Sequence, residues 1–129
     1  MSSRVNYASG SAWEDMVGYS RAVRVGKVIE VSGTVASDET GAVVGEEDAY
    51  LQTKYIYQKI EAVLLRAGAT LNNIVRVRMF VTDIKRWQEY GKAHSEMFHL
   101  IKPCNTMVQV ASLIETCFLI EIEATAMLE

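Results

Sequence analysis

Several side chains in this sequence could do chemistry, and each also has a structural explanation. Glu121 could position or activate a water molecule, or it could equally pair with Arg76 or Arg78. Arg21 follows Tyr19 by two positions, so in a β-strand the two side chains point the same way. Arg21 could therefore supply a positive charge beside the tyrosine, or form a structural salt bridge.

The histidines and cysteines favour structural roles. His94 shares a predicted helix face with Trp87 and Tyr90, which favours a packed, hydrogen-bonded histidine, with a role in a ligand pocket as the alternative. His94 and His99 are five residues apart and do not stack on one helix face, so we expect no metal site. Cys104 has no evident histidine and carboxylate partner for nucleophilic catalysis.

Length and composition indicate one globular domain over residues 1–129. Half of the residues are hydrophobic, and the formal net charge is −3. An acidic chain without a basic stripe argues against nucleic-acid binding. No apolar run approaches the roughly 18 residues of a membrane span, and residues 1–16 lack the apolar stretch of a signal peptide. With only two cysteines, we expect a cytoplasmic protein.

Hydrophobic periodicity predicts an α+β order, β-β-α-β-α-β-β, with a short additional strand at residues 3–7. Gly26-Lys27 suits a tight type II′ turn inside the first hairpin, and Gly68 suits the end of the first helix. The predicted strands are 20–37 (a hairpin), 73–82, 106–113 and 117–128, and the predicted helices are 47–67 and 84–100. One sheet with two helices packed on one face is the economical arrangement.

The second face of this sheet is predicted to be neither an ordinary core nor an ordinary surface. Its polar residues are Arg76, Arg78, Gln109, Glu121 and Glu123, and its apolar ones are Ile74, Phe80, Met107 and Leu119. Such a face is often covered by another subunit, with arginine–glutamate pairs satisfying the charges. We therefore expect a homo-oligomer whose sheets pack together.

Four segments together resemble the YjgF/RidA family of reactive-intermediate deaminases, also known as L-PSP endoribonucleases. They are GYSRAVRVG, AGATLNNIVRVRMFVTDI, the single proline Pro103 before a strand, and the closing LIEIEATA. The resemblance covers roughly residues 17–128. It implies a chorismate-mutase-like fold with one mixed sheet, assembled as a homotrimer whose sheets form a central barrel. It also implies small-molecule pockets between subunits and hydrolysis of 2-imino acids with no metal or organic cofactor.

When the family's site residues are carried over by position, some are the same in this sequence and others differ. Tyr19 and Ser32 match pocket residues, with Gly33 beside them, and Glu121 matches the glutamate that positions water. The carboxylate-binding arginine is replaced by Asn105, and a common cysteine by Met107. An asparagine of the second helix falls near Gly91. We expect Asn105 and Glu121 to be catalytic, and Tyr19, Arg21, Ser32, Gly33, His94 and Met107 to bind the ligand.

Asn105 changes the substrate that the resemblance implies. Asparagine offers neutral donors, and a hydrogen bond to a charged group contributes about 1.5–3 kcal/mol, against roughly 1 kcal/mol for a neutral one. The chain is similar to an arginine-lacking branch of the family, so we expect a deaminase or related hydrolase whose substrate needs no arginine–carboxylate contact. A non-catalytic small-metabolite binder is the alternative, and an endoribonuclease is a third reading.

Overall fold

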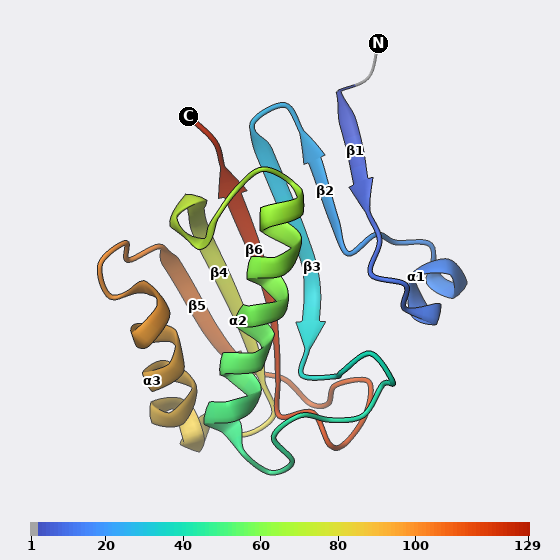
Figure 1. Ribbon diagram of the computed structural model, residues 1–129. Helices are drawn as coiled ribbons and strands as arrows, with labels where there is room; N and C mark the ends of the chain where they lie inside the picture. Colours follow the sequence, from blue (N-terminus) through green and yellow to red (C-terminus); the bar gives the residue numbers. More distant parts are fainter. Residues whose placement is uncertain (1–2) are drawn as a thin grey trace.

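The computed structural model describes residues 3–129 and shows one six-stranded mixed sheet (Figure 1). The strand order is β1-β2-β3-β6-β4-β5, in which only the β4–β5 pair is parallel among the pairings of the described chain. The strands are β1 Arg4–Tyr7, β2 Ala22–Val25, β3 Val28–Val35, β4 Ile74–Val81, β5 Cys104–Gln109 and β6 Ile120–Met127. The predicted order of strands along the chain is confirmed, including the short first strand.

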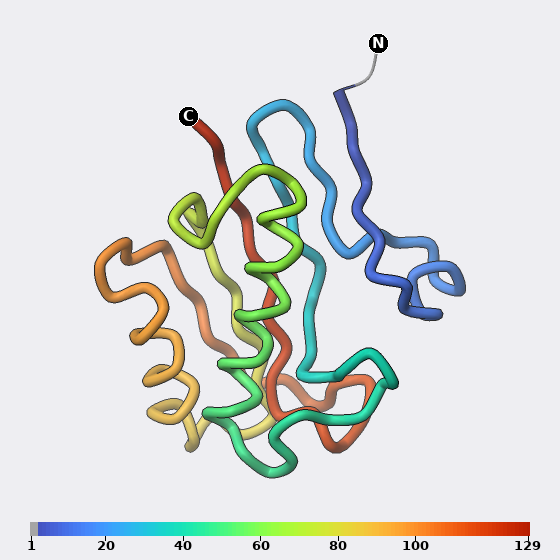
Figure 2. Tube along the Cα trace, viewed as in Figure 1, coloured from blue at the N-terminus to red at the C-terminus, as the bar shows by residue number. Residues whose placement is uncertain are grey.

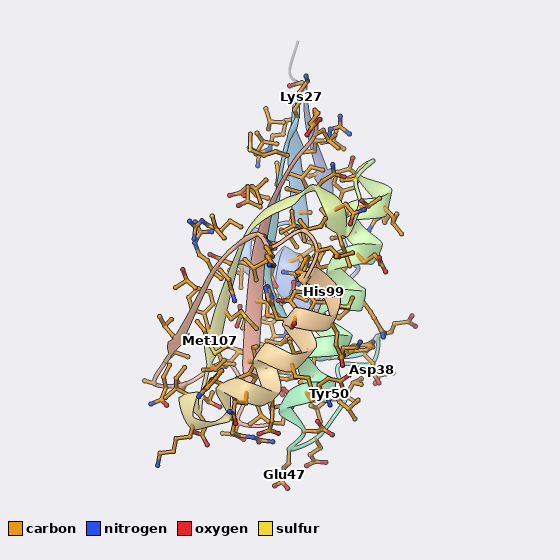
Figure 3. The ribbon with its side chains drawn as sticks, turned by 90° about the vertical axis from the view of Figure 1, so that its left-hand side faces the viewer. Lys27, Asp38, Glu47, Tyr50, His99 and Met107 are labelled. Atoms are coloured by element: carbon orange, nitrogen blue, oxygen red, sulfur yellow. The ribbon has the colours of Figure 1, made fainter. Side chains whose placement is uncertain are left out.

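Helices α2 (Ala49–Arg66) and α3 (Trp87–Phe98) cover one face of the sheet, as predicted. Figure 3 shows the two layers edge-on, with Tyr50 and His99 in the helix layer and Met107 on the sheet. Asp48 caps α2 by accepting a hydrogen bond from Leu51 N at 2.9 Å. Gly68 follows its last turn at φ 88°, a left-handed conformation that glycine adopts without strain.

The second predicted helix starts later than its sequence pattern indicates. Residues 84–86 form a 3₁₀ turn, η2 (Ile84–Arg86), in which Asp83 accepts from Lys85 N at 3.0 Å. The α-helix then begins at Trp87, whose side chain is exposed, whereas Tyr90 is buried. A second 3₁₀ turn, η1 (Leu71–Asn73), leads into β4.

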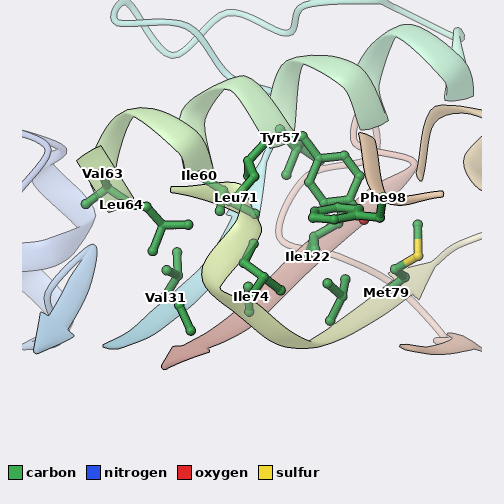
Figure 4. Packing of buried hydrophobic residues seen from close by; sticks show 14 of the residues in the cluster. Val31, Tyr57, Ile60, Val63, Leu64, Leu71, Ile74, Met79, Phe98 and Ile122 are labelled. Carbon is green, nitrogen blue, oxygen red and sulfur yellow. The ribbon is translucent and has the colours of Figure 1, made fainter. Parts of the chain in front are cut away.

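The hydrophobic core fills the space between the sheet and the two helices (Figure 4). Side chains of β3, β4 and β6 point toward α2, and Phe98 of α3 packs edge-on against Tyr57 at 5.1 Å between ring centroids. Every residue of the apolar stripe that helical periodicity predicts over 47–67 is buried, with Gln52 and Tyr57 buried beside it. The stripe consists of Ala49, Thr53, Ile56, Ile60, Val63, Leu64 and Ala67. Gln52 also joins two loops that lie together in Figure 2, by donating to Gly45 O and Cys117 O, both at 3.0 Å.

Three residues that were predicted to lie on the second face of the sheet, Ile74, Met107 and Gln109, lie on its helix-covered face instead. Ile74 is buried in the core, and Val75 is exposed instead, because the register between β4 and β6 shifts between Ile74 and Arg76. Met107 pairs with Met79, a core residue, and therefore packs on the helix-covered side. Gln109 pairs with the buried Val81 on that same side.

A short helix near the N-terminus, α1 (Ala12–Val17), was not predicted. It lies beside the edge of the sheet formed by β1 and β2, apart from α2 and α3 (Figure 1). Ser11 caps it by accepting from Trp13 N at 3.3 Å, and Gly18 ends it at φ 86°. The sequence Ser11-x-x-Glu14 is a capping-box pattern, which is the signal that would have predicted it. Within residues 3–129, no helix has the length and apolar character needed to cross a membrane.

Candidate functional site

Strands β3 and β6 and the segment just before β2 bring Tyr19, Arg21, Ser32, Gly33 and Glu121 together. The β2–β3 hairpin places Arg21 opposite Ser32, whose N–H donates to Arg21 O at 3.0 Å. Strand β6 lies on the other side of β3, with Glu121 opposite Val35. Five of the eight predicted site residues therefore form one cluster within a single chain.

A bulge in β3 creates the closest contact of this cluster. The β3–β6 register shifts between Val31 and Thr34, so β3 carries one extra residue here, and Ser32 and Gly33 together lie opposite the single residue Glu123. The Glu121 carboxylate lies directly over Gly33, and a Cβ added at Gly33 would stand 2.0 Å from Glu121 Oε2. The Glu121 carboxylate thus occupies the space that a side chain at position 33 would need.

Arg21 is held against the backbone of the same bulge. One terminal nitrogen of its guanidinium donates to Gly33 O at 2.5 Å, while its buried Nε has no hydrogen-bond partner. Burial lowers the pKa of Arg21, and the nearby Tyr19, Glu14 and Glu121 act in the opposite direction. The guanidinium also lies 5.9 Å from the centre of the Tyr19 ring.

Glu121 combines partial burial with neighbours of both charges. Burial raises its pKa, Arg21 opposes that effect, and Glu123 adds to it. Glu123 itself pairs with Arg78 at 3.5 Å, an arginine–glutamate pair of the kind predicted for this face. A carboxyl group with a raised pKa can accept a proton from water and return it later in a reaction.

Lys59 of α2 is a further cation beside the cluster, and sequence reasoning missed it. Its Nζ donates to Val35 O at 2.8 Å, Ser37 O at 2.9 Å and Ser37 Oγ at 3.3 Å. Burial lowers the pKa of Lys59 to about 8, with Arg21 lowering it further and Asp38 opposing. Lys59 and Arg21 thus bond to carbonyl groups of β3 beyond Val31, where its pairing with β2 stops.

An open cleft of about 540 Å³ adjoins the cluster along β1, α1 and β2. The Ser32 hydroxyl donates to Ser20 O at 2.6 Å, which fixes one wall. The cleft is lined by Arg4, Asn6, Glu14, Asp15, Gly18, Tyr19, Ser20, Val23 and Ser32. A smaller hollow of about 220 Å³ shares Val23 and Ser32 with it and extends over Glu123 and Arg78.

The other three predicted site residues lie elsewhere in the chain. Asn105 is exposed on β5, at the opposite edge of the sheet, and Met107 lies on the same strand. His94 lies in the helix layer, where its Nδ1 is 2.6 Å from Tyr57 Oη and burial lowers its pKa. Its ring also packs 4.8 Å from the Phe98 ring.

No group of three or more histidine, cysteine, aspartate or glutamate residues within residues 3–129 is arranged to hold a metal ion. What the cluster offers is a half-buried carboxyl group, a guanidinium, a phenol and a hydroxyl beside an open cleft. This set suits binding of a small polar molecule and proton transfer to or from water.

Comparison with known proteins identifies the family to which this chain belongs. Residues 9–128 match the family model of endoribonuclease L-PSP, and the chain belongs to this YjgF/RidA family. A RutC family protein of Pyrococcus abyssi is 38% identical over 84% of each chain. The resemblance seen in the sequence is thereby confirmed at the level of the family.

Solved structures of relatives confirm the chorismate-mutase-like fold. A member of the YjgF/YER057c/UK114 family from Mycobacterium tuberculosis is 44% identical and superposes with a TM-score of 0.89, covering 98% of this chain and 100% of its own. A protein of unknown function of the conserved Rid family from Yersinia pestis is 30% identical with a TM-score of 0.82, covering 95% of this chain and 94% of its own.

Proposed function

We propose that this protein hydrolyses a small imine or enamine to a carbonyl compound and ammonia, at the cluster around Glu121 and without a cofactor. The observation that carries the proposal is the Glu121 carboxyl group over Gly33, with its raised pKa and its neighbour Arg21. Membership in the YjgF/RidA family supports it.

The proposed reaction converts an iminium ion and water into a carbonyl compound and an ammonium ion. Water attacks the iminium carbon and transfers a proton to Glu121, which gives a neutral carbinolamine. Glu121 then protonates the nitrogen, the C–N bond breaks, and the hydroxyl proton passes to the departing ammonia as the C=O bond forms. Tyr19 and Ser32 line the space for the substrate, and Arg21 fixes the Gly33 carbonyl beside Glu121.

We further propose a homotrimer in which a neighbouring subunit completes the cleft. Asn105 is exposed at the opposite edge of the sheet from Tyr19 and Arg21, so it would reach the cluster of another copy rather than its own. The open sheet face presents the exposed Val75 and the half-buried Phe80 with the Arg78–Glu123 pair. Light scattering should then give a mass near 43 kDa, three times the 14.4 kDa of one chain. A monomer would contradict the shared cleft.

Asn105 bears on the choice of substrate because it supplies no positive charge. Because asparagine carries no charge, the cleft has no fixed cation at this position to hold a substrate carboxylate. We therefore propose a substrate that does not depend on the arginine–carboxylate contact of the family. We also propose a cytoplasmic location, in which the free thiols of Cys104 and Cys117 would remain reduced.

The test is the rate of ammonia release from freshly generated imines, with and without a carboxylate, in the presence of the protein. We expect acceleration that is lost in Glu121→Gln and kept in Glu39→Gln, which removes one negative charge from an exposed loop. Thermal stabilisation by a ligand without any turnover would contradict the hydrolase and point to a small-metabolite binder.

A further inference from the structure

Lys59 of α2 makes three hydrogen bonds beside the candidate site, and neither the family resemblance nor the proposed reaction uses it. Its half-buried ammonium group donates to Val35 O at 2.8 Å, to Ser37 O at 2.9 Å and to Ser37 Oγ at 3.3 Å. A charged lysine has three N–H donors, so these three oxygens match its full capacity. A neutral amine has one N–H fewer and would leave one of the oxygens without this donor.

The backbone that Lys59 holds belongs to the same stretch of β3 that holds Glu121. Val35 lies directly opposite Glu121 in the β3–β6 pairing, and the Glu121 carboxylate lies over Gly33, two residues earlier. The pairing of β2 with β3 stops before this stretch, so its carbonyl groups need donors from elsewhere. Arg21 donates to Gly33 O, and Lys59 donates to Val35 O. These two cations therefore take the place of a neighbouring strand beside the residues that position Glu121.

Three titratable side chains lie around the Lys59 ammonium group. Arg21 precedes β2, Asp38 follows β3, and the Tyr55 ring on α2 has its centre 6.0 Å from Lys59 Nζ. Burial, with a smaller effect from Arg21, lowers the pKa of Lys59 to about 8, and Asp38 opposes the shift. Lys59 is therefore charged at neutral pH and loses its charge as the pH rises above about 8. It is not among the residues that line the open cleft, so it acts on the site through β3.

We propose that Lys59 is a positioning residue of this site: its ammonium group holds the end of β3 in the conformation that keeps the Glu121 carboxylate over Gly33, so the reaction requires Lys59 in its charged form. The inference rests on the proposed function for the reaction itself. It goes further because it assigns the upper pH limit of that reaction to a side chain of the helix layer that does not contact the substrate.

Lys59→Met tests this role because methionine occupies much of the space of the lysine chain and donates no hydrogen bond. Ammonia release is measured on two freshly generated imines, 2-iminobutyrate with a carboxylate and 3-methylbutan-1-imine without one. Displacement of a catalytic group by about 1 Å can cost ~100-fold in rate, so we expect a smaller shift of Glu121 to lower kcat by about tenfold at neutral pH. KM should stay within about twofold of the wild type, because Lys59 does not line the cleft.

Lys54→Met is the matched control for this variant. Lys54 lies on the same helix and pairs with Glu96 at 3.2 Å, on the side of α2 that faces α3. Its loss removes a lysine charge from α2 without touching β3, so kcat and KM should both remain unchanged. The same kcat in Lys59→Met as in the wild type would overturn the inference.

The pH dependence of kcat separates the charge of Lys59 from the packing of its side chain. The ratio of kcat in the wild type to kcat in Lys59→Met cancels the titration of the substrate. It should fall from about tenfold at neutral pH toward one as Lys59 loses its proton around pH 8. Lys59→Arg keeps a positive charge over this range, so it should retain activity where the wild type has lost it. A ratio that is constant with pH, or a Lys59→Arg variant whose kcat falls in parallel with the wild type, would overturn the inference.

A nuclear magnetic resonance titration of the free protein distinguishes this inference from the proposed function. In the wild type, the carboxyl carbon signal of Glu121 and the amide signal of Gly33 should shift with the same midpoint as Lys59 Cε. In Lys59→Met, neither signal should titrate near that midpoint. Coupled shifts without acceleration of imine hydrolysis would refute the hydrolase and keep the role of Lys59. Glu121 and Gly33 signals that do not follow the titration of Lys59, in a protein that hydrolyses either imine, would refute the role of Lys59 and keep the hydrolase.

Discussion

Substitution of Gly33 by alanine separates the chemistry of the site from the stability of the fold. The added methyl group would stand 2.0 Å from Glu121 Oε2, 2.9 Å from Cδ and 3.2 Å from Cγ. An ordinary contact is about 3.4 Å or longer, so the carboxylate would have to move by roughly 1.4 Å. A displacement of about 1 Å in a catalytic group can cost ~100-fold in rate.

The fold should tolerate the same change. Gly33 does not have a positive φ, so alanine fits its backbone, and the displaced group is the free end of a flexible side chain. Alanine also restricts the unfolded chain, which stabilises by about 0.4–1 kcal/mol where the native conformation allows it. We therefore expect a free energy of unfolding within ~1 kcal/mol of the wild type, together with a loss of about 100-fold in ammonia release.

Gly91→Ala is the matched control for this experiment. Gly91 lies within α3, and a Cβ added there meets nothing within 4 Å. Because glycine inside a helix costs about 0.8–1.0 kcal/mol relative to alanine, this variant should be more stable with unchanged activity. Full activity in Gly33→Ala, measured alongside this control, would refute the assignment of Glu121 to the chemistry.

Three further predictions follow from the charges of the site. Because the pKa of Glu121 is raised in the folded state, its contribution to stability is lost as the pH rises above 4.5. Over this range, the free energy of unfolding should therefore fall in the wild type relative to Glu121→Gln, which denaturant unfolding at a series of pH values will show. Burial lowers the pKa of Lys59 to about 8, so between about pH 8 and 10.5 the unfolded chain binds more protons than the folded one. The free energy of unfolding of the wild type should therefore rise with pH relative to that of Lys59→Met. The same pH dependence in both proteins would contradict the burial of the ammonium group. Asn105→Arg should raise the rate of ammonia release from 2-iminobutyrate by about tenfold, since it restores a charged donor for the carboxylate; an unchanged rate would place residue 105 outside the cleft.

Periodicity predicted the layers of this fold because the core-facing side chains repeat at helix and strand spacing. The stripe of α2 and the alternation of β6 are read directly from residue types. The errors occur where one residue breaks that repeat. The shift at Ile74 exchanges it with Val75, and the pairing of Met107 with Met79 places Met107 on the helix side. The pairing registers of β4 with β5 and of β4 with β6 cannot be inferred from the residue types within each strand.

The cluster was predictable in its members but not in its geometry. Tyr19, Ser32 and Glu121 follow from family resemblance, whereas the bulge that places Gly33 under Glu121 depends on the register between β3 and β6. Lys59 was missed because a lysine on an amphipathic helix is ordinarily exposed to solvent. Its three oxygen partners lie on β3 and the following loop, far away in the sequence.

The most direct test of the account is a crystal structure of the protein with 3-methylbutanamide, a neutral compound that resembles the carbinolamine and resists hydrolysis. We predict that its amide group lies against Glu121 and Tyr19, with Asn105 of a neighbouring subunit closing the cleft. Binding of the compound away from Glu121, or an Asn105 that lies far from every Glu121 in the assembly, would contradict the account.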